Sequence, residues 1–106
     1  MITTRCLLYY KQSTRTDSKN VAFQYKQQAE EVADSLRNVN DEFLCHVLLR
    51  GRLEYINKWG EDPVNKKRQL EQIKKEAKEA LEMHPRSWKL KEVEKQINYT
   101  YLSLAL

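Results

Sequence analysis

Four side chains in this sequence could ligate a metal ion or take part in nucleophilic chemistry: Cys6, Cys45, His46 and His84. Zinc ligands usually come in pairs separated by roughly two to four residues, and no two of these residues have that spacing. The adjacent Cys45 and His46 point in different directions on either a helix or a strand. We therefore expect that the protein holds no metal ion and no other cofactor.

A catalytic site also needs a base near the nucleophile and a pocket of hydrogen-bond donors for the developing charge. Gly51 and Gly60 are isolated, so the chain has neither a glycine-rich turn nor a phosphate-binding loop. The acidic pair Glu30 and Glu31 falls where the polar face of a helix is expected. We predict that the protein is not an enzyme and takes no small-molecule substrate.

The composition favours one small helical domain. The chain has 106 residues, of which 41% are hydrophobic and 32% charged, and only two are glycine and two proline. Few turn-forming residues argue against a loop-rich β protein. No apolar run approaches the roughly 18 residues of a membrane span, and the apolar part of the N-terminus is too short for a signal peptide. We predict a cytoplasmic protein that does not bind membranes, in which Cys6 and Cys45 stay reduced.

Three segments have clear helical signals. Apolar residues recur every three or four positions after Asp17 or Ser18 and predict a helix that ends near Asn38 or Asn40. Asp62 and Pro63 are a strong start signal for a second helix, over 63–83, which His84 and Pro85 should end. Ser87 can cap a last helix, over 88–104.

Two segments are ambiguous. Residues 41–60 read as a helix with Leu44, Leu48, Tyr55 and Trp59 on one face, although Gly51 would weaken its middle by about 1 kcal/mol. The same segment could form a hairpin with strands near 43–49 and 53–57, turning at Arg50 and Gly51. Residues 1–16 could be an N-terminal arm or an edge strand, since 2–10 is rich in strand-forming residues.

We prefer the helical reading and predict an all-α single domain over residues 1–106. In this reading an antiparallel bundle of about four helices, spanning 17–106, follows a short N-terminal arm. The alternative is a small α+β domain with strands near 2–10, 43–49 and 53–57. A faint internal repeat is also present, because Val32, Leu36 and Phe43 lie 45 residues before Ala77, Leu81 and Trp88.

The last predicted helix carries two apolar stripes. One contains Leu90, Val93, Ile97, Tyr101 and Leu104, and the opposite one contains Trp88, Tyr99, Leu102 and Leu106. A bundle helix normally buries one stripe, so the second must be covered by the N-terminal arm, by a second copy of the chain or by another protein. We predict that the protein is a non-catalytic adaptor or inhibitor, a regulator that binds another protein or itself through this second stripe.

Nucleic-acid binding is the alternative function. The formal net charge is +4, and residues 63–106 hold ten of the cations but only six of the anions. Clustered cations on residues 66–95 could contact phosphates. The members of this predicted basic surface are Lys67, Arg68, Lys74, Lys75, Lys78, Lys89, Lys91 and Lys95. Glutamates such as Glu71 and Glu79 interleave with them, which is typical of a solvated helical face. We therefore prefer protein binding.

Overall fold

A computed structural model gives the structure of residues 2–34, 42–60 and 62–105. In these ranges the chain forms five α-helices and no strand, which confirms the all-α class. The helices are α1 (Ile2–Arg15), α2 (Lys19–Asp34), α3 (Glu42–Trp59), α4 (Pro63–Met83) and α5 (Trp88–Ala105). None of the described helices is both long enough and apolar enough to cross a membrane.

The predicted caps are present. The Asp62 carboxylate accepts a hydrogen bond from the Val64 amide at 3.0 Å, and Pro63 begins α4. The Ser87 hydroxyl accepts one from the Leu90 amide at 3.2 Å at the start of α5. At the start of α2, the Ser18 hydroxyl accepts one from the Val21 amide at 3.4 Å. The predicted end of the first helix, near Asn38 or Asn40, lies outside the described residues.

Two sequence-based expectations are wrong. Residues 2–15 form a helix rather than an arm or an edge strand, so the described part of the chain forms a bundle of five helices instead of about four. Cys6, Tyr10 and Ser13 recur at helical spacing and are all buried, and this packing outweighs the strand propensity of the segment. The hairpin alternative for 43–49 and 53–57 is also wrong, because 42–59 is one helix.

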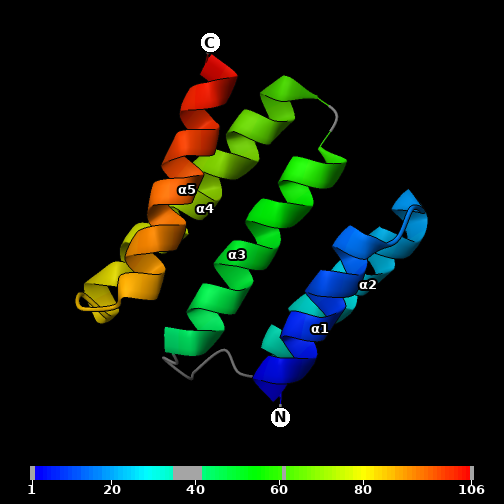
Figure 1. Ribbon diagram of the computed structural model, residues 1–106, viewed down its shortest axis with the longest axis horizontal. Coiled ribbons are helices and arrows are strands. Elements are labelled where there is room, and N and C mark those ends of the chain that lie inside the picture. The colour runs from blue at the N-terminus through cyan, green and yellow to red at the C-terminus, as the bar shows by residue number, and fades with distance from the viewer. Residues whose placement is uncertain (1, 35–41, 61, 106) are drawn as a thin grey trace.

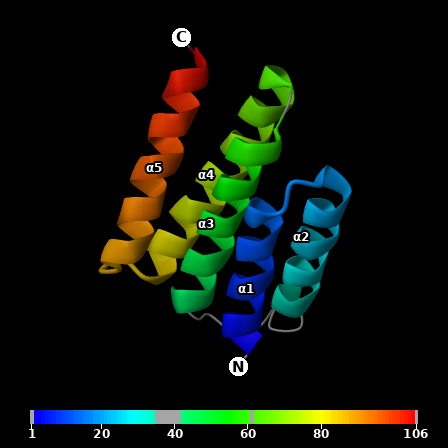
Figure 2. The ribbon, with the colours of Figure 1, turned by 45° about the vertical axis from the view of Figure 1, so that its right-hand side comes forward.

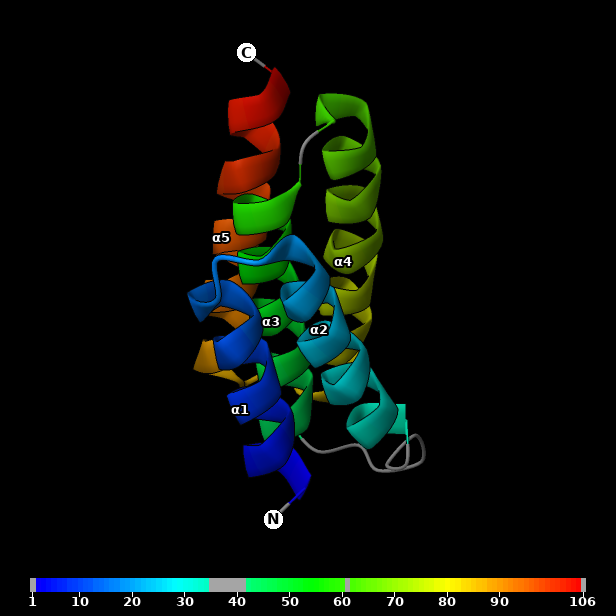
Figure 3. The ribbon, with the colours of Figure 1, turned by 90° about the vertical axis from the view of Figure 1, so that its right-hand side faces the viewer.

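Each helix runs antiparallel to the one before it, so that α1, α3 and α5 share one direction (Figure 1). The α1–α2 hairpin packs on one side of α3 and the α4–α5 hairpin on the other (Figures 1 and 2). The result is a flattened arrangement of 32 × 31 × 18 Å. Seen from the side, α2 and α4 lie on one side of the molecule and α1 and α5 on the other (Figure 3).

The core consists of two clusters that share α3. The larger cluster joins α3, α4 and α5, and its buried residues are Leu49, Leu53, Ile56, Leu70, Ile73, Ala77, Ala80, Leu90, Val93 and Ile97. The smaller cluster joins α1, α2 and α3 through Cys6, Tyr10, Ala29, Ala33 and Val47. Helix α3 therefore buries residues against both hairpins, which no other described helix does.

A partly buried ion network ties the two hairpins together. Arg52 of α3 donates two hydrogen bonds to Glu30 of α2, at 2.8 and 2.9 Å, and pairs with Glu76 of α4 on its other side. The Tyr10 hydroxyl of α1 donates to the same Glu30 carboxylate. Arg52 thus occupies an otherwise apolar part of α3 because two carboxylates and a bidentate geometry compensate for its burial.

Candidate protein-binding surface

The second stripe of α5 is exposed. Trp88, Tyr99 and Leu102 are 71%, 76% and 63% exposed, although they are large side chains. The opposite stripe is the one that the core buries, through Leu90, Val93 and Ile97. The N-terminal segment does not cover the exposed stripe, since α1 packs against α2 and α3 on the other side of the molecule (Figure 1). Leu106, the fourth predicted member, lies outside the described residues.

The exposed stripe is longer than its apolar members alone suggest. Successive steps of four, three, four and three residues lead from Trp88 through Glu92, Lys95 and Tyr99 to Leu102. This spacing keeps all five residues on one line of a helix and is the spacing along which two helices pack against each other. We call these five residues the outer seam. The predicted stripe did not include Glu92 or Lys95, because it was defined by apolar residues; Lys95 was assigned to the predicted basic surface instead.

The polar residues divide the predicted site into two ends. Trp88 and Tyr99 are eleven residues apart, about 16 Å along a helix, and Glu92 and Lys95 lie between them. Tyr99 and Leu102 remain neighbours at the C-terminal end of α5. The three described members of the predicted stripe are therefore not one continuous apolar patch, and anything that covers all three must also meet the two charges.

The Trp88 end has a neighbour from α3 that sequence reasoning did not find. The Lys89 ammonium lies 5.2 Å from the centroid of the Phe43 ring and 5.9 Å from that of the Trp88 ring. Phe43 is 42% exposed. The sequence contained one signal for this contact: Phe43 is a large apolar residue that does not belong to the predicted apolar face of 41–60. A cation between two aromatic rings extends this end of the surface onto α3.

A comparison of α3 with α5 indicates what the outer seam is suited for. Both helices have 18 residues, and both their first and their last residues are 46 positions apart. Leu44 and Val47 of α3 then match Leu90 and Val93 of α5, and all four are buried. This offset differs by one residue from that of the faint sequence repeat, which pairs other residues and stays a prediction.

On one side of the two helices, the matched residues of α3 and α5 differ in burial. Leu49, Leu53 and Ile56 of α3 are buried by the α4–α5 hairpin. Their counterparts on α5 are Lys95, Tyr99 and Leu102, of which the last two are large and exposed. The outer seam thus includes the side of α5 that corresponds to the side of α3 on which the next helix pair packs.

The predicted basic surface is divided as well. Lys67 and Lys74 of α4 lie 5.6 and 5.3 Å from the centroid of the Tyr101 ring, and the Tyr101 hydroxyl donates to Glu71 at 2.9 Å. This hydrogen bond to Glu71 raises the pKa of Tyr101. Lys89 lies elsewhere, over Phe43. The other predicted members, which are all exposed, are Arg68, Lys75, Lys78, Lys91 and Lys95.

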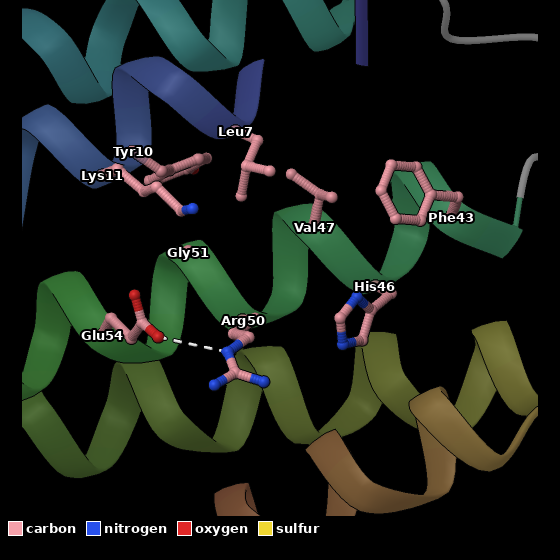
Figure 4. A pocket seen from close by; sticks show the side chains of 9 residues that line it. All are labelled: Leu7, Tyr10, Lys11, Phe43, His46, Val47, Arg50, Gly51 and Glu54. Atoms are coloured by element: carbon pink, nitrogen blue, oxygen red, sulfur yellow. Dashed lines mark hydrogen bonds and ion pairs between the residues drawn. The ribbon is translucent and has the colours of Figure 1, made fainter. Parts of the chain in front are cut away.

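A cavity of about 290 Å³ lies between α1 and α3 (Figure 4). Leu7 and Val47 supply apolar walls, and Arg50 is paired with Glu54 at 3.2 Å. Burial, with the positive charges of Arg50 and Lys89, lowers the pKa of His46. The imidazole is therefore neutral at physiological pH. The residues that line this cavity include no cysteine and no serine to act as its nucleophile.

The two cysteines are free thiols. Cys6 is fully buried and donates to the Ala29 carbonyl at 3.5 Å. Burial, with a smaller effect of Glu30, raises the pKa of Cys6 to about 11, so that it is a poor nucleophile near neutral pH. Among the described residues no three of His, Cys, Asp and Glu are grouped so as to hold a metal ion.

Comparisons with protein-family models, with curated proteins and with solved structures found no match to this chain.

Proposed function

We propose that this protein is a non-catalytic adaptor or inhibitor that binds another protein, or a second copy of itself, through the outer seam of α5. The observation that carries the proposal is the match between α3 and α5. Where α3 buries Leu53 and Ile56 under a following helix pair, α5 exposes Tyr99 and Leu102. Such a site is suited to a helix of a partner, which would pack there as α4 and α5 pack on α3.

The energetics set a minimum size for the contact. Full burial of a large apolar side chain contributes roughly 1.5–3 kcal/mol, so that Trp88, Tyr99 and Leu102 together supply roughly 3–6 kcal/mol, allowing for the parts already covered. Association costs about 4–15 kcal/mol. The three side chains alone therefore cannot hold a partner tightly. We expect the partner to run along the whole seam and to pair with Glu92 and Lys95 as well.

The mechanism would be recruitment or occlusion. Aromatic side chains give affinity because they bury a large area with few rotatable bonds, and the surrounding charges select the partner and set the association rate. We place the protein in the cytoplasm, where the free thiols of Cys6 and Cys45 would persist.

The test is a comparison of two double variants in capture from native lysate. Tyr99→Asp with Leu102→Asp should abolish capture of the partner and leave the circular dichroism spectrum unchanged. The control is Leu8→Asp with Val64→Asp, which changes two similarly exposed residues on α1 and α4 and should leave capture intact. If the variant with Tyr99→Asp and Leu102→Asp captures the partner as well as the control does, and binds the purified partner equally well, the seam is not the binding site.

Nucleic-acid binding is a second candidate, and the grouping of Lys67 and Lys74 around Tyr101 favours it, because cations beside an aromatic ring suit a phosphate backbone and its bases. Glu71 in the same group opposes it. If the protein binds nucleic acid there, the affinity for single-stranded and duplex DNA should fall steeply with added salt. It should also be lost in the triple variant Lys67→Glu, Lys74→Glu and Lys78→Glu. Binding that does not depend on salt or on these lysines excludes this candidate.

A further inference from the structure

We infer that the partner of the outer seam is the same seam of a second copy, paired antiparallel about a two-fold axis. This inference rests on the proposed function, because it requires that the seam binds protein, and it identifies that protein by chemistry. It draws on the order of residue types along the seam: aromatic, acidic, basic, aromatic and aliphatic.

The charges select the orientation of the two helices. In a parallel, in-register pair Glu92 would face Glu92 of the second copy, and Lys95 would face Lys95, so both central layers would be repulsive. In an antiparallel pair, the two-fold axis lies midway between Glu92 and Lys95. Glu92 of each copy then faces Lys95 of the other copy. Both central layers then become ion pairs.

The same register matches the apolar residues. With Glu92 opposite Lys95, Trp88 lies opposite Tyr99 of the second copy, so that two aromatic layers flank the two ion pairs. Leu102 lies opposite Pro85, which is exposed in the turn before α5. A neighbouring antiparallel register, with Lys95 opposite Tyr99, would place Glu92 against Leu102 and leave the carboxylate without a cation in the contact. The antiparallel register with Glu92 opposite Lys95 is thus preferred over both the parallel pair and the neighbouring antiparallel register.

The available area predicts a reversible dimer. A fully exposed aromatic side chain offers roughly 150–250 Å², and Trp88 and Tyr99 are 71% and 76% exposed. The four aromatic rings of two copies therefore bury roughly 450–750 Å². A stable interface usually buries about 1,200 Å² or more. We expect dissociation within the micromolar to millimolar range, so the measurement must cover that range.

The experiment is sedimentation equilibrium of the purified full chain from about 10 µM to about 1 mM. The wild type should shift from monomer to dimer with increasing concentration. Glu92→Lys alone and Lys95→Glu alone should each raise the dissociation constant at least about tenfold, because each turns both ion pairs into like-charge contacts. The double variant Glu92→Lys with Lys95→Glu should dimerise again.

An equimolar mixture of the two single variants gives the sharpest result. In a mixed pair, the two cations of one copy face the two anions of the other, so the mixture should form heterodimers although neither variant dimerises alone. Glu79→Lys and Lys78→Glu are matched controls, since they make the same charge changes at exposed positions of α4, and both should dimerise like the wild type. Circular dichroism should show equal helix content in all variants.

Each contrary outcome has a distinct meaning. A wild type that stays monomeric at 1 mM, or a mixture that stays monomeric, overturns self-pairing in this register. If Tyr99→Asp with Leu102→Asp still abolishes partner capture in that case, the proposed function stands with a different partner. If the wild type dimerises as described but partner capture does not depend on Tyr99 and Leu102, adaptor binding through the seam fails and self-pairing stands.

Discussion

At the scale of single residues, Gly51 shows how a contact between helices can reverse a local preference. A Cβ atom at this position would lie 2.6 and 2.8 Å from the two Cδ atoms of the Tyr10 ring, far inside van der Waals contact. Glycine in the middle of α3 therefore lets α1 approach closely, and its cost to helix stability is offset by the burial of a tyrosine that is only 1% exposed.

This contact predicts the sign of a substitution. Helix propensity alone would make Gly51→Ala stabilising by about 1 kcal/mol. We expect it instead to destabilise the protein by about 1–3 kcal/mol, because the methyl group overlaps the Tyr10 ring. Urea unfolding followed by circular dichroism measures the change. Asn57→Ala, at an exposed position of the same helix, should change the free energy of unfolding by less than about 0.5 kcal/mol. A stabilised Gly51→Ala variant would contradict the packing of α1 on α3.

The carboxylate of Glu30 makes stability depend on pH. Burial alone would raise its pKa, but hydrogen bonds from Arg52 and Tyr10 outweigh burial and lower it below the ordinary value of 4.5. Since the pKa is lower in the folded state, the stabilising contribution is complete above about pH 4.5 and is lost as the pH falls through the folded-state pKa. The wild type should therefore unfold more easily at pH 3 than at pH 6.

Removing Arg52 isolates this effect. Arg52→Met should destabilise the protein at pH 6 by about 1–3 kcal/mol, because Glu30 and Glu76 lose the cation between them. The difference between variant and wild type should shrink as the pH falls from 6 towards 3, because protonation of Glu30 removes its ion pair with Arg52 in the wild type and its unpaired charge in the variant. Thermal unfolding at both pH values measures it. A difference that stays the same at pH 3 and pH 6 would show that Arg52 acts only through packing.

At the scale of whole helices, the turn between α4 and α5 positions the outer seam. Ser87 accepts a hydrogen bond from the Leu90 amide and donates one to Glu42 at 2.5 Å, so it both caps α5 and ties it to the start of α3. It is only 6% exposed. The orientation of α5, and with it the direction in which Trp88 points, depends on this residue.

Ser87→Ala should therefore cost about 1–2 kcal/mol of stability, as expected for the loss of an N-cap together with a hydrogen bond between helices. Ser103→Ala is the matched control, because Ser103 is exposed and its hydroxyl donates to the Tyr99 carbonyl of the same helix. Its effect should be below about 0.5 kcal/mol. Equal effects of the two substitutions in urea unfolding would contradict the role of Ser87 as a tie to α3.

At the scale of the whole molecule, the two core clusters should differ in stability. Among the residues whose burial the structure describes, the cluster of α3, α4 and α5 contains ten buried residues, including large aliphatic ones, whereas that of α1, α2 and α3 contains five, two of them alanines. Hydrophobic stabilisation grows with the apolar area buried, so the α1–α2 hairpin should open more readily than the rest.

Hydrogen exchange tests this difference. Amides of α1 and α2 should exchange faster than those of α4 and α5 at neutral pH, and Arg52→Met should accelerate α1 and α2 further while changing α5 little, because Arg52 joins the hairpins through Glu30. Uniform protection across the helices would indicate a single cooperative unit instead.

Local signals in the sequence determined much of this fold. Asp62, Pro63 and His84 set both ends of α4, and Ser87 set the start of α5, because caps and prolines act on amides within a few residues of themselves. The two faces of α5 followed from periodicity alone. The same local rules left 41–60 open between a helix and a hairpin, and the preferred helix is the one that the structure contains.

Only the tertiary structure decided the remaining features. The helix at 2–15 depends on the burial of Cys6, Tyr10 and Ser13, and the place of Arg52 depends on carboxylates 22 and 24 residues away in the sequence. Whether the seam of α5 is buried depends on where the other helices pack. Contacts between distant segments decide these features, because burial and charge pairing act through space, and the spacing of residues along one helix carries no information about which surface another helix covers.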